Sequence, residues 1–391
     1  MTKILKMKQV VIRWATNLLF FLGLPFIGFS QQTINGSINH DGQQRDYILY
    51  VPESYTGDSP VPLIFNFHGY SNTAGLQMRY GDFRSIADTA GFIIVHPQGT
   101  LLRGITHWNV GGWTVGSTTD DVGFTEALIS FIASEYNVDL ARVYATGMSN
   151  GGYMSFLLAC QLSNKIAAIA SVTGSMTPEI FNDCNPQHPT PVLQIHGTTD
   201  AVVPYYGANW TKPIDKVMEY WVNYNNCSLT AATTTLPNIN VIDGSIVEHI
   251  VYDGGDNNST AEHFKVKGGG HTWPGTALVG PGTNYDFDAS AEIWKFFSRY
   301  DLNGLREATN IEPLGENHLR LKIYPNPTHS LVSIEFETLQ EVNYHLLSLT
   351  GEIVLSGTIH SSQYDINLLG LPRGVYVLRI GNRGYKIVKT E

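Results

Sequence analysis

Charged residues are scarce in this sequence, and basic ones are scarcer than acidic ones. Charged side chains make up 15% of the 391 residues, against roughly 25% in an average soluble domain. Asp and Glu outnumber Lys and Arg by 34 to 24, and the formal net charge is −10. No stripe of Lys and Arg forms the positive surface that a phosphate backbone requires, so we expect no nucleic-acid partner. With 43% apolar residues, the chain is predicted to fold into a well-packed globular protein.

Apolar runs long enough to span a membrane are also missing near the N-terminus. The run Leu18–Phe29 has twelve residues, whereas a helix that crosses a bilayer needs about 20. It follows a basic segment and leads into Gly28 and Ser30, small residues at the two positions that a signal peptidase reads. Residues 1–30 are therefore predicted to be a signal peptide, with Gln31 as the first mature residue. An uncleaved N-terminal anchor is the alternative.

Only three cysteines are present: Cys160, Cys184 and Cys227. In an oxidising compartment they allow one disulfide and leave one thiol over. Cys160 lies in an apolar helical run and is expected to be buried. The other two lie in loop-like contexts, so the predicted disulfide joins Cys184 to Cys227. None of the three follows the kind of turn that presents a nucleophile, which argues against a catalytic cysteine.

Predicted strands and helices alternate from about residue 45 to residue 300. Several of the strands are nearly continuous apolar runs, as a parallel sheet covered by helices on both faces requires. The pattern therefore predicts a mostly parallel α/β domain over residues 31–302. The predicted strands are Arg45–Val51, Val61–Phe67, Phe92–His96, Arg142–Thr146, Ala167–Val172 and Pro191–His196, and the predicted helices are Gly75–Thr89, Asp121–Tyr136, Gly151–Leu162, Lys212–Asn226 and Ala289–Tyr300.

The composition changes after Tyr300. Residues 303–319 are polar, carry Gly and Pro, and are predicted to be a linker. From residue 320 to residue 391 short alternating strands are separated by turn residues such as Thr350-Gly351. This pattern predicts a separate all-β, sandwich-like domain.

The most specific motif is Gly147-Met148-Ser149-Asn150-Gly151, which lies between a predicted strand and a predicted helix. This is the context of a nucleophile elbow, in which a tight turn raises the serine Oγ at the start of a helix. The glycines two residues before and after the serine let the backbone pass. The helix N-terminus favours developing negative charge. Ser149 is therefore the predicted nucleophile.

A nucleophilic serine needs a base and an orienting carboxylate, which follow in the order Ser, Asp or Glu, His in this type of domain. Asp200 lies on a loop directly after the predicted strand Pro191–His196. His271 follows three glycines, in a loop able to bring its imidazole to both partners. Asp200 and His271 are therefore predicted to complete a triad. The alternatives are Asp215, Asp243, Asp253 and Asp256 for the acid, and His249, His263 and the histidines of the C-terminal region for the base.

The oxyanion that forms during acyl transfer needs two N–H donors. We expect one from Asn150, the residue after the nucleophile, and one from Tyr70, in the loop His68-Gly69-Tyr70 that follows a predicted strand. His68 is expected to orient this loop rather than to transfer protons.

Aromatic residues near the predicted triad suggest substrate contacts. Trp273 and the Tyr70 ring are predicted to bind substrate, whereas Trp108 and Trp113 are expected to serve packing. Residues 253–260 are rich in Asp, Asn and Gly. A solvated hairpin turn is favoured there over a calcium site, because the spacing matches no EF-hand loop.

Taken together, these motifs resemble the secreted polyhydroxybutyrate depolymerase and feruloyl esterase branch of the α/β-hydrolases. The resemblance spans about residues 36–300 and includes Gly268-Gly269-Gly270-His271-Thr272-Trp273-Pro274-Gly275. It implies an α/β-hydrolase fold and ester hydrolysis through an acyl-serine, with no metal or organic cofactor. It leaves the ester open: feruloyl or acetyl groups of plant polysaccharides rank ahead of a polyester.

Two other classes stay open at this point. One is a non-catalytic secreted binding protein on a hydrolase scaffold. The other is a metal-dependent deacetylase, which is disfavoured because no His and Asp cluster has ligand spacing.

The C-terminal region resembles the sorting domain of type IX secretion substrates. The resemblance rests on Ile323-Tyr324-Pro325-Asn326-Pro327, on Leu371-Pro372-Arg373-Gly374 and on the basic end Lys386–Lys389. It implies export across the outer membrane and contact with the type IX machinery. A small carbohydrate-binding or spacer module is the alternative. The expected partners are thus a polymeric or oligomeric ester and this machinery, and the chain is expected to be a monomer.

Overall fold

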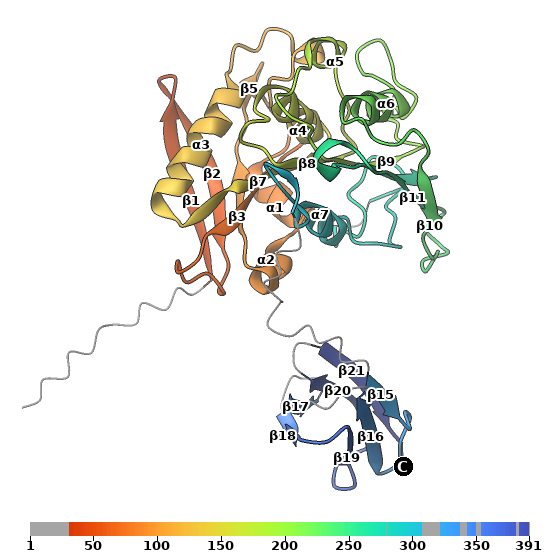
Figure 1. Cartoon of the computed structure of the whole chain (residues 1–391). Helices are drawn as coiled ribbons and strands as arrows, with labels where there is room; N and C mark the ends of the chain where they lie inside the picture. Colours follow the sequence, from red (N-terminus) through yellow and green to blue (C-terminus); the bar gives the residue numbers. More distant parts are fainter. Residues whose placement is uncertain are drawn as a thin grey trace, which may run out of the picture. The chain divides into compact units, whose positions relative to one another are not determined.

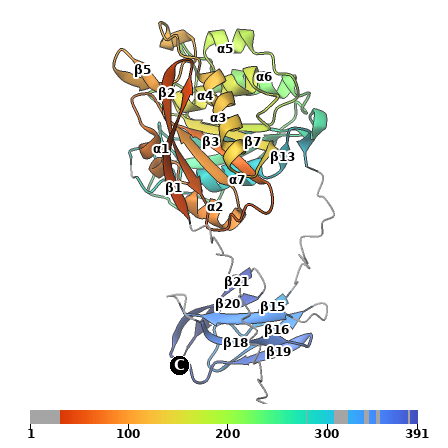
Figure 2. The same cartoon turned by 90° about the vertical axis from the view of Figure 1, so that its left-hand side faces the viewer.

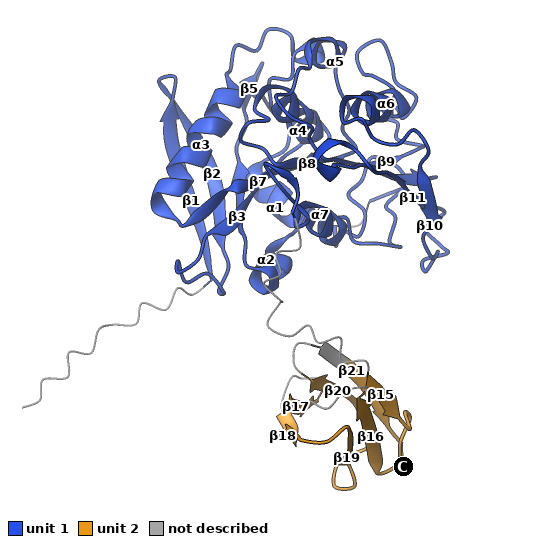
Figure 3. Cartoon of the chain, viewed as in Figure 1, with its two compact units in different colours: residues 1–306 blue, residues 307–391 orange. Residues whose placement is uncertain are grey.

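In a computed structural model of the chain, the described residues are 31–278, 280–306, 321–336, 342–348, 353–380 and 383–390. They form two compact units, divided between Arg306 and Glu307 (Figure 3). Each unit is described by itself. The predicted signal peptide, residues 1–30, lies outside the described residues, as does most of the predicted linker.

The elements of the first unit are as follows. Its strands are β1 (Gln32–His40), β2 (Gln43–Val51), β3 (Val61–Phe67), β4 (Ile93–Pro97), β5 (Thr100–Leu102), β6 (Ile105–His107), β7 (Val138–Met148), β8 (Ala168–Val172), β9 (Val192–Gly197), β10 (Ala232–Thr235), β11 (Ile246–Tyr252), β12 (Ala261–Lys267), β13 (Tyr300–Asp301) and β14 (Gly304–Leu305). Its helices are α1 (Ala74–Tyr80), α2 (Arg84–Ala90), α3 (Asp121–Glu135), α4 (Asn150–Gln161), α5 (Pro178–Asp183), α6 (Ile214–Tyr224) and α7 (Ala289–Phe297), with 3-10 turns η1 (Gly112–Thr114) and η2 (Asp256–Asn258).

A ten-stranded sheet runs through the first unit in the order β1-β2-β4-β3-β7-β8-β9-β12-β11-β10 (Figures 1 and 2). The six neighbours from β4 to β12 pair in parallel. The strands at both ends of the sheet pair antiparallel. Because parallel strands end at the same edge, the loops after β3, β7, β9 and β12 emerge on one side of the sheet.

Helices cover both faces of this sheet. On one face, side chains of α3, α4 and α6 join those of the strands in one apolar core. On the other face, α2 and α7 do the same. This confirms the α/β-hydrolase arrangement predicted from the apolar strand runs. Among the described residues, no helix has the length and apolar character to cross a membrane.

The predicted helix Gly75–Thr89 is wrong in one respect, because it is two helices. α1 ends at Tyr80, with Gly81 as its C-cap, and α2 begins at Arg84. The Trp273 ring, from a loop almost two hundred residues away, packs against Gly81 so closely that a Cβ there would lie 2.8 Å from Cζ2. A contact this distant in sequence leaves no trace in the local periodicity.

The first unit extends slightly into the segment predicted as linker. β13 and β14 pair as a short hairpin, and Tyr144 Oη on β7 donates to the Tyr300 carbonyl at 2.6 Å. Residues up to Arg306 thus belong to the first unit.

The second unit is all β. Its strands are β15 (Leu321–Tyr324), β16 (Leu331–Phe336), β17 (Val342–Leu347), β18 (Ile353–Ile359), β19 (Gln363–Asn367), β20 (Gly374–Ile380) and β21 (Arg383–Lys389). They form two sheets, β15-β16-β19 and β18-β17-β20-β21. Side chains from both sheets, including Ile334 and Leu378, share one apolar core. This is the small sandwich-like domain that the alternating pattern predicted.

The disulfide predicted between Cys184 and Cys227 is wrong. Cys184 pairs instead with Cys160, and their Cα atoms lie 4.8 Å apart. Cys160 is in the last turn of α4 and Cys184 directly follows α5, a helix that packs on α4. Cys227 follows α6 as a buried free thiol. Burial of Cys160 was predicted correctly. Burial does not prevent a disulfide here, because the end of α5 places Cys184 next to Cys160.

Thiol titration of the unreduced, denatured protein distinguishes the two pairings. The Cys160→Ser variant is expected to show two free thiols, whereas a Cys184–Cys227 bridge would leave none. Breaking the bridge, which spans 24 residues, is expected to lower the free energy of unfolding by about 3 kcal/mol, because the open chain gains entropy. Denaturant unfolding of Cys160→Ser measures this loss. Cys227→Ser serves as the matched control and should show no free thiol.

Candidate active site

Ser149 lies in a strained turn between β7 and α4. Its φ is 56° and its ψ is −119°. Residues other than glycine rarely adopt this backbone conformation, which costs on the order of 1–3 kcal/mol. The turn is held because β7 lies in the middle of the sheet and Ser149 N donates to the Val172 carbonyl at 2.9 Å. The predicted elbow is thus the geometry that this segment adopts.

The glycines around Ser149 are needed for close packing. A Cβ on Gly147 would lie 2.6 Å from the Phe67 carbonyl oxygen, and one on Gly151 would collide with the same oxygen. A Cβ on Gly152 would meet Ser171 Oγ at 2.6 Å. The start of α4 can therefore approach the ends of β3 and β8 only without side chains at these positions.

Asp200 and His271 are brought together from two loops. Asp200 follows β9, and its Oδ2 lies 2.7 Å from His271 Nδ1. Its Oδ1 accepts from the backbone N–H groups of Val202 and Val203, both at 2.8 Å. The carboxylate is fully buried, whereas the His271 side chain is 17% exposed. Such a carboxylate fixes the Nδ1–H tautomer of His271 and leaves Nε2 free to accept a proton.

The hydrogen bonds around Asp200 favour its ionised form. Burial by itself would raise the pKa of this carboxyl, but hydrogen bonds from His196 and His271 outweigh it and hold the pKa well below its usual range. Asp200 is therefore a carboxylate near neutral pH.

The strand order places these groups along one edge of the sheet. Ser149 follows β7, Asp200 follows β9 and His271 follows β12, and the neighbouring strands run β7-β8-β9-β12. All four are parallel, so the three side chains emerge at their shared carboxyl edge.

The loop His68-Gly69-Tyr70 lies directly over Ser149. A Cβ built on Gly69 would be 3.4 Å from Ser149 Cβ, so the Tyr70 backbone is next to the nucleophile. Asn150 is the first residue of α4, where helical N–H groups have no acceptor within the helix. Its side-chain Oδ1 accepts a hydrogen bond from Trp108 N at 2.7 Å, and its Nδ2 donates to the Trp108 carbonyl at 3.2 Å.

His68 orients its loop through both ring nitrogens. Nδ1 lies 2.7 Å from the Gly69 carbonyl and Nε2 accepts from Gly99 N at 2.9 Å. Burial lowers the pKa of His68 to about 4, and the ring is therefore neutral near pH 7. Trp108 Nε1 donates to the His68 carbonyl at 2.9 Å. These contacts match the expected orienting role, and they account for Trp108 as a packing residue.

An aromatic pocket opens at Ser149. Its volume is about 580 Å³, and it is lined by Tyr70, Trp113, Ser149, Tyr153, Val202, Val203, Asn209 and Trp210. Trp113 meets three of the rings edge to face, with centroids 5.6 Å from Tyr70, 5.8 Å from Tyr153 and 6.4 Å from Trp210. Mutually supporting rings of this kind form a firm wall for an apolar ligand.

Most of the aromatic residues that line this pocket were not predicted from the sequence. Trp113 was predicted to serve packing, and no sequence pattern predicted a role for Tyr153 or Trp210. Tyr153 had a local signal, because it lies one helical turn after Ser149 and Tyr153 N donates to the Ser149 carbonyl. Trp113 and Trp210 come from separate loops, and only the folded chain brings them together.

Trp273 was predicted to bind substrate, and this prediction is wrong. Its side chain is 1% exposed and packs on Gly81 and on Phe83, with ring centroids 6.1 Å apart. Its Nε1 donates to Ser290 Oγ at 3.2 Å. The backbone turns between His271 and Trp273. The two side chains therefore point in different directions, and the indole of Trp273 lies in the core.

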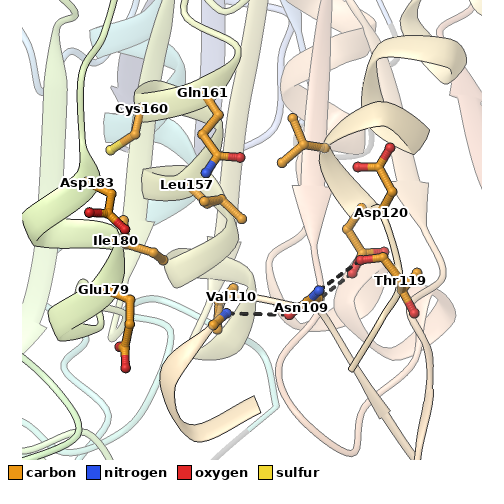
Figure 4. Close-up of a pocket in the computed structure, with 13 residues that line it drawn as sticks. Asn109, Val110, Thr119, Asp120, Leu157, Cys160, Gln161, Glu179, Ile180 and Asp183 are labelled. Atoms are coloured by element: carbon orange, nitrogen blue, oxygen red, sulfur yellow. Dashed lines mark hydrogen bonds between the residues drawn. The ribbon is translucent and has the colours of Figure 1, made fainter. Parts of the chain in front are cut away.

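A second pocket, of about 290 Å³, lies beside the disulfide and contains none of the triad residues (Figure 4). Glu179 and Asp183 lie on one side of it, and Thr119 and Asp120 on the other. Asp120 caps α3 by accepting from Gly123 N at 2.8 Å. A capping role thus accounts for Asp120 without substrate.

One group of side chains with metal-binding potential gathers within the described part of the chain: His40, Asp41 and Asp120. It contains no residue of 253–260. That segment joins β11 to β12 through η2, and Asn226 Nδ2 donates to Asp256 Oδ2 at 2.6 Å. Because β11 and β12 pair antiparallel up to Tyr252 and Ala261, the segment is the turn of a hairpin.

Comparisons with known proteins give two family matches. Residues 123–233 match the phospholipase/carboxylesterase family, and residues 322–390 match the secretion system C-terminal sorting domain. A sorting domain of this kind directs the protein that carries it to type IX secretion. The protein is therefore secreted or bound at the cell surface.

Several curated relatives are esterases. The chain is 28% identical over 276 residues to a bifunctional acetylxylan esterase/xylanase of Neocallimastix patriciarum, covering 70% of this chain and 36% of that protein. It is 36% identical over 165 residues to feruloyl esterase B of Piromyces equi, covering 42% and 30%. It is 26% identical over 281 residues to feruloyl esterase D of Neurospora crassa, covering 69% and 86%. The chain thus spans about a third of the length of the first two relatives.

Among solved structures, an acetyl xylan esterase from Aspergillus awamori superposes with a TM-score of 0.50. It is 15% identical in sequence, and the match covers 69% of this chain and 99% of that one. This likeness supports the fold. The first unit thus has an α/β-hydrolase fold and contains a match to the phospholipase/carboxylesterase family, and the second unit contains a match to the secretion system C-terminal sorting domain.

Proposed function

We propose that this protein is a secreted carboxylic ester hydrolase that uses Ser149, His271 and Asp200 and acts on feruloyl or acetyl esters of plant polysaccharides. The observation that carries the proposal is the strained serine that lines an aromatic pocket, at the same sheet edge as a hydrogen-bonded Asp–His pair. One chain supplies the triad and the pocket, so a monomer suffices.

The proposed reaction has two halves. Ser149 Oγ attacks the ester carbonyl carbon while its proton passes to His271 Nε2, and the carbonyl electrons move onto oxygen. The N–H groups of Tyr70 and Asn150 stabilise this oxyanion. When the oxyanion collapses, the bond to the alcohol breaks and His271 returns the proton to the leaving oxygen. Water then attacks the acyl-serine in the same way, releasing the acid and restoring Ser149.

The pocket favours an aromatic acyl group within this class. Four of its eight lining residues are aromatic and two are valines. A planar phenolic acid fits between such rings, and each favourable ring contact adds about 0.5–1.5 kcal/mol beyond the area buried. An acetyl group is too small to reach most of them. We therefore rank feruloyl esters above acetyl esters.

Two alternatives remain testable beside this proposal. A polyhydroxyalkanoate depolymerase would use the same triad on an aliphatic polyester. A non-catalytic binding protein would retain the pocket without turnover. Incubating the purified protein with feruloylated arabinoxylan, acetylxylan and polyhydroxybutyrate, and measuring release of ferulate, acetate and 3-hydroxybutyrate, separates all three. Release of ferulate or acetate supports the proposal, release of 3-hydroxybutyrate alone favours the polyester, and no release favours binding.

Removal of the central ring of the pocket is expected to act on aromatic substrates. Trp113→Ala should lower kcat/KM for methyl ferulate by about 10-fold or more, because Trp113 supports three other rings. The same variant should change kcat/KM for p-nitrophenyl acetate by less than about 3-fold, because the acyl methyl does not reach the wall. Steady-state kinetics on the two esters measures both. Tyr206→Ala is the matched control, since this exposed ring lies outside the pocket lining. Equal losses on both esters would contradict an acyl-binding role for the pocket.

A further inference from the structure

We infer that His196 is a positioning residue for Asp200, and that Gln194 holds His196 in the one tautomer able to do this. The inference rests on the proposed function, because it assigns a supporting pair to the same triad. The sequence predicts only that both residues lie on the strand that leads to Asp200.

The His196 ring contacts the same carboxylate oxygen of Asp200 as His271 does. Its side chain is fully buried, and Nε2 lies 3.3 Å from Asp200 Oδ2. The same Nε2 lies 2.9 Å from the Val203 carbonyl oxygen. A carbonyl can only accept, so the hydrogen must be on Nε2, where it is shared between Val203 O and the carboxylate.

Gln194 determines the state of the other ring nitrogen. Its Nε2 lies 2.9 Å from the Gly174 carbonyl, which identifies this amide atom as the nitrogen, because an oxygen there would face another acceptor. The same nitrogen lies 2.9 Å from His196 Nδ1. It donates to Nδ1, which therefore carries no hydrogen. His196 is thus a neutral ring with its hydrogen on Nε2.

The sheet explains why these two side chains meet. Gln194 and His196 are two residues apart on β9, so they project from the same face of the strand. Asp200 lies on the turn that follows. Through Val203 O, His196 ties this turn back to the strand, while the N–H groups of Val202 and Val203 hold Asp200 Oδ1.

The position of the carboxylate is therefore fixed from two sides. Oδ1 is held by the turn, and Oδ2 is held between His196 and His271. Without His196, the turn loses its side-chain tie to β9 and Oδ2 loses one of its two donors, so the carboxylate can rotate away from His271 Nδ1. A carboxylate misplaced by a few tenths of an ångström orients the base less well, which lowers kcat more than substrate binding.

Two replacements at position 196 test the role of the donor. His196→Phe keeps a ring of similar shape but removes the N–H, whereas His196→Gln can place an amide N–H where Nε2 was. We expect His196→Phe to lower kcat for p-nitrophenyl acetate by about 10- to 100-fold, with KM changed by less than about 2-fold. His196→Gln should recover most of this loss. The low-field proton resonance of His271 Nδ1–H should be present in the wild type and in His196→Gln, and lost in His196→Phe.

A matched control is available on the neighbouring strand. His263 is also buried, its ring stacks on Tyr205 with centroids 5.8 Å apart, and its Nε2 has no partner within the described residues. It makes no contact with Asp200 among those residues, so His263→Phe should leave kcat within about 2-fold of the wild type. Equal kcat in His196→Phe and His263→Phe would overturn the inference, as would a His196→Gln variant as impaired as His196→Phe.

A second variant covers the case in which His196→Phe does not fold. Gln194→Met leaves His196 in place but removes the donor that selects its tautomer. We expect kcat to fall about 3- to 10-fold with KM unchanged, and an unchanged kcat would overturn the inference. Ser149→Ala separates this failure from a failure of the proposed function. If Ser149→Ala is inactive while the 194 and 196 variants act as the wild type, only the positioning role is wrong. If Ser149→Ala is as active as the wild type, the proposed function itself is wrong.

Discussion

Replacing Ser149 with alanine is expected to lower kcat for p-nitrophenyl acetate by about 10⁴- to 10⁶-fold. The reason is that Ser149 Oγ forms the acyl intermediate, and no neighbouring hydroxyl occupies the elbow. The remaining rate would come from the N–H groups that stabilise the oxyanion and from binding of the substrate. Stopped-time product measurements at high enzyme concentration are needed to see it.

The loss should be confined to chemistry. Alanine and serine both carry a Cβ, so the substitution leaves the strain at φ 56° unchanged, and the melting temperature should stay within a few degrees of the wild type. Ser130→Ala, an exposed hydroxyl on α3 that donates to the Glu126 carbonyl, is the matched control and should retain full activity. A wild-type rate in Ser149→Ala would exclude the serine mechanism.

Replacing Asp200 with asparagine is expected to lower kcat by about 10⁴-fold. The amide can donate its own hydrogen to His271 Nδ1, which would turn the imidazole to the Nε2–H tautomer and prevent it from accepting the Ser149 proton. The amide also carries no charge to stabilise the imidazolium. Kinetics of Asp200→Asn near pH 8 measures the effect, with Asp253→Asn in the exposed β11–β12 turn as the control.

Asp200 should also make stability depend on pH. Its pKa is lower in the folded protein than in the unfolded chain, so its contribution to stability is complete above the unfolded value of about 3.9 and is lost as the pH falls below it. Denaturant unfolding between pH 3 and pH 6 should therefore show a steeper loss of stability toward low pH in the wild type than in Asp200→Asn. Parallel profiles would contradict the depressed pKa.

The sequence was sufficient for the parts of the site that depend on strand ends. Ser149, Asp200 and the Tyr70 loop each directly follow an apolar strand, and parallel strands bring their carboxyl ends to one edge. His271 was located through its three preceding glycines. These signals are local in the sequence. The parallel strands then place the loops that carry these residues at one edge of the sheet.

The parts that failed depend on contacts between distant segments. The pairing of Cys160 depends on where α5 crosses α4, and the burial of Trp273 depends on the space left by Gly81. The aromatic wall depends on three loops that share no pattern. His196 is predicted only as the end of a strand, because nothing in the sequence distinguishes a buried histidine that bonds a carboxylate from one that merely fills the core.

Helix α4 carries a consequence for how activity is lost. Eleven of its twelve residues are buried, since it lies beneath other elements and against the centre of the sheet. A helix enclosed on all sides cannot fray or open by itself, so the turn that holds Ser149 belongs to the most cooperative part of the domain. Amide hydrogens of α4 should exchange only through global unfolding. Heat or denaturant should then abolish catalysis in the same transition that unfolds the core of the first unit. The outer strands β10 and β11 should open earlier and leave the catalytic turn intact.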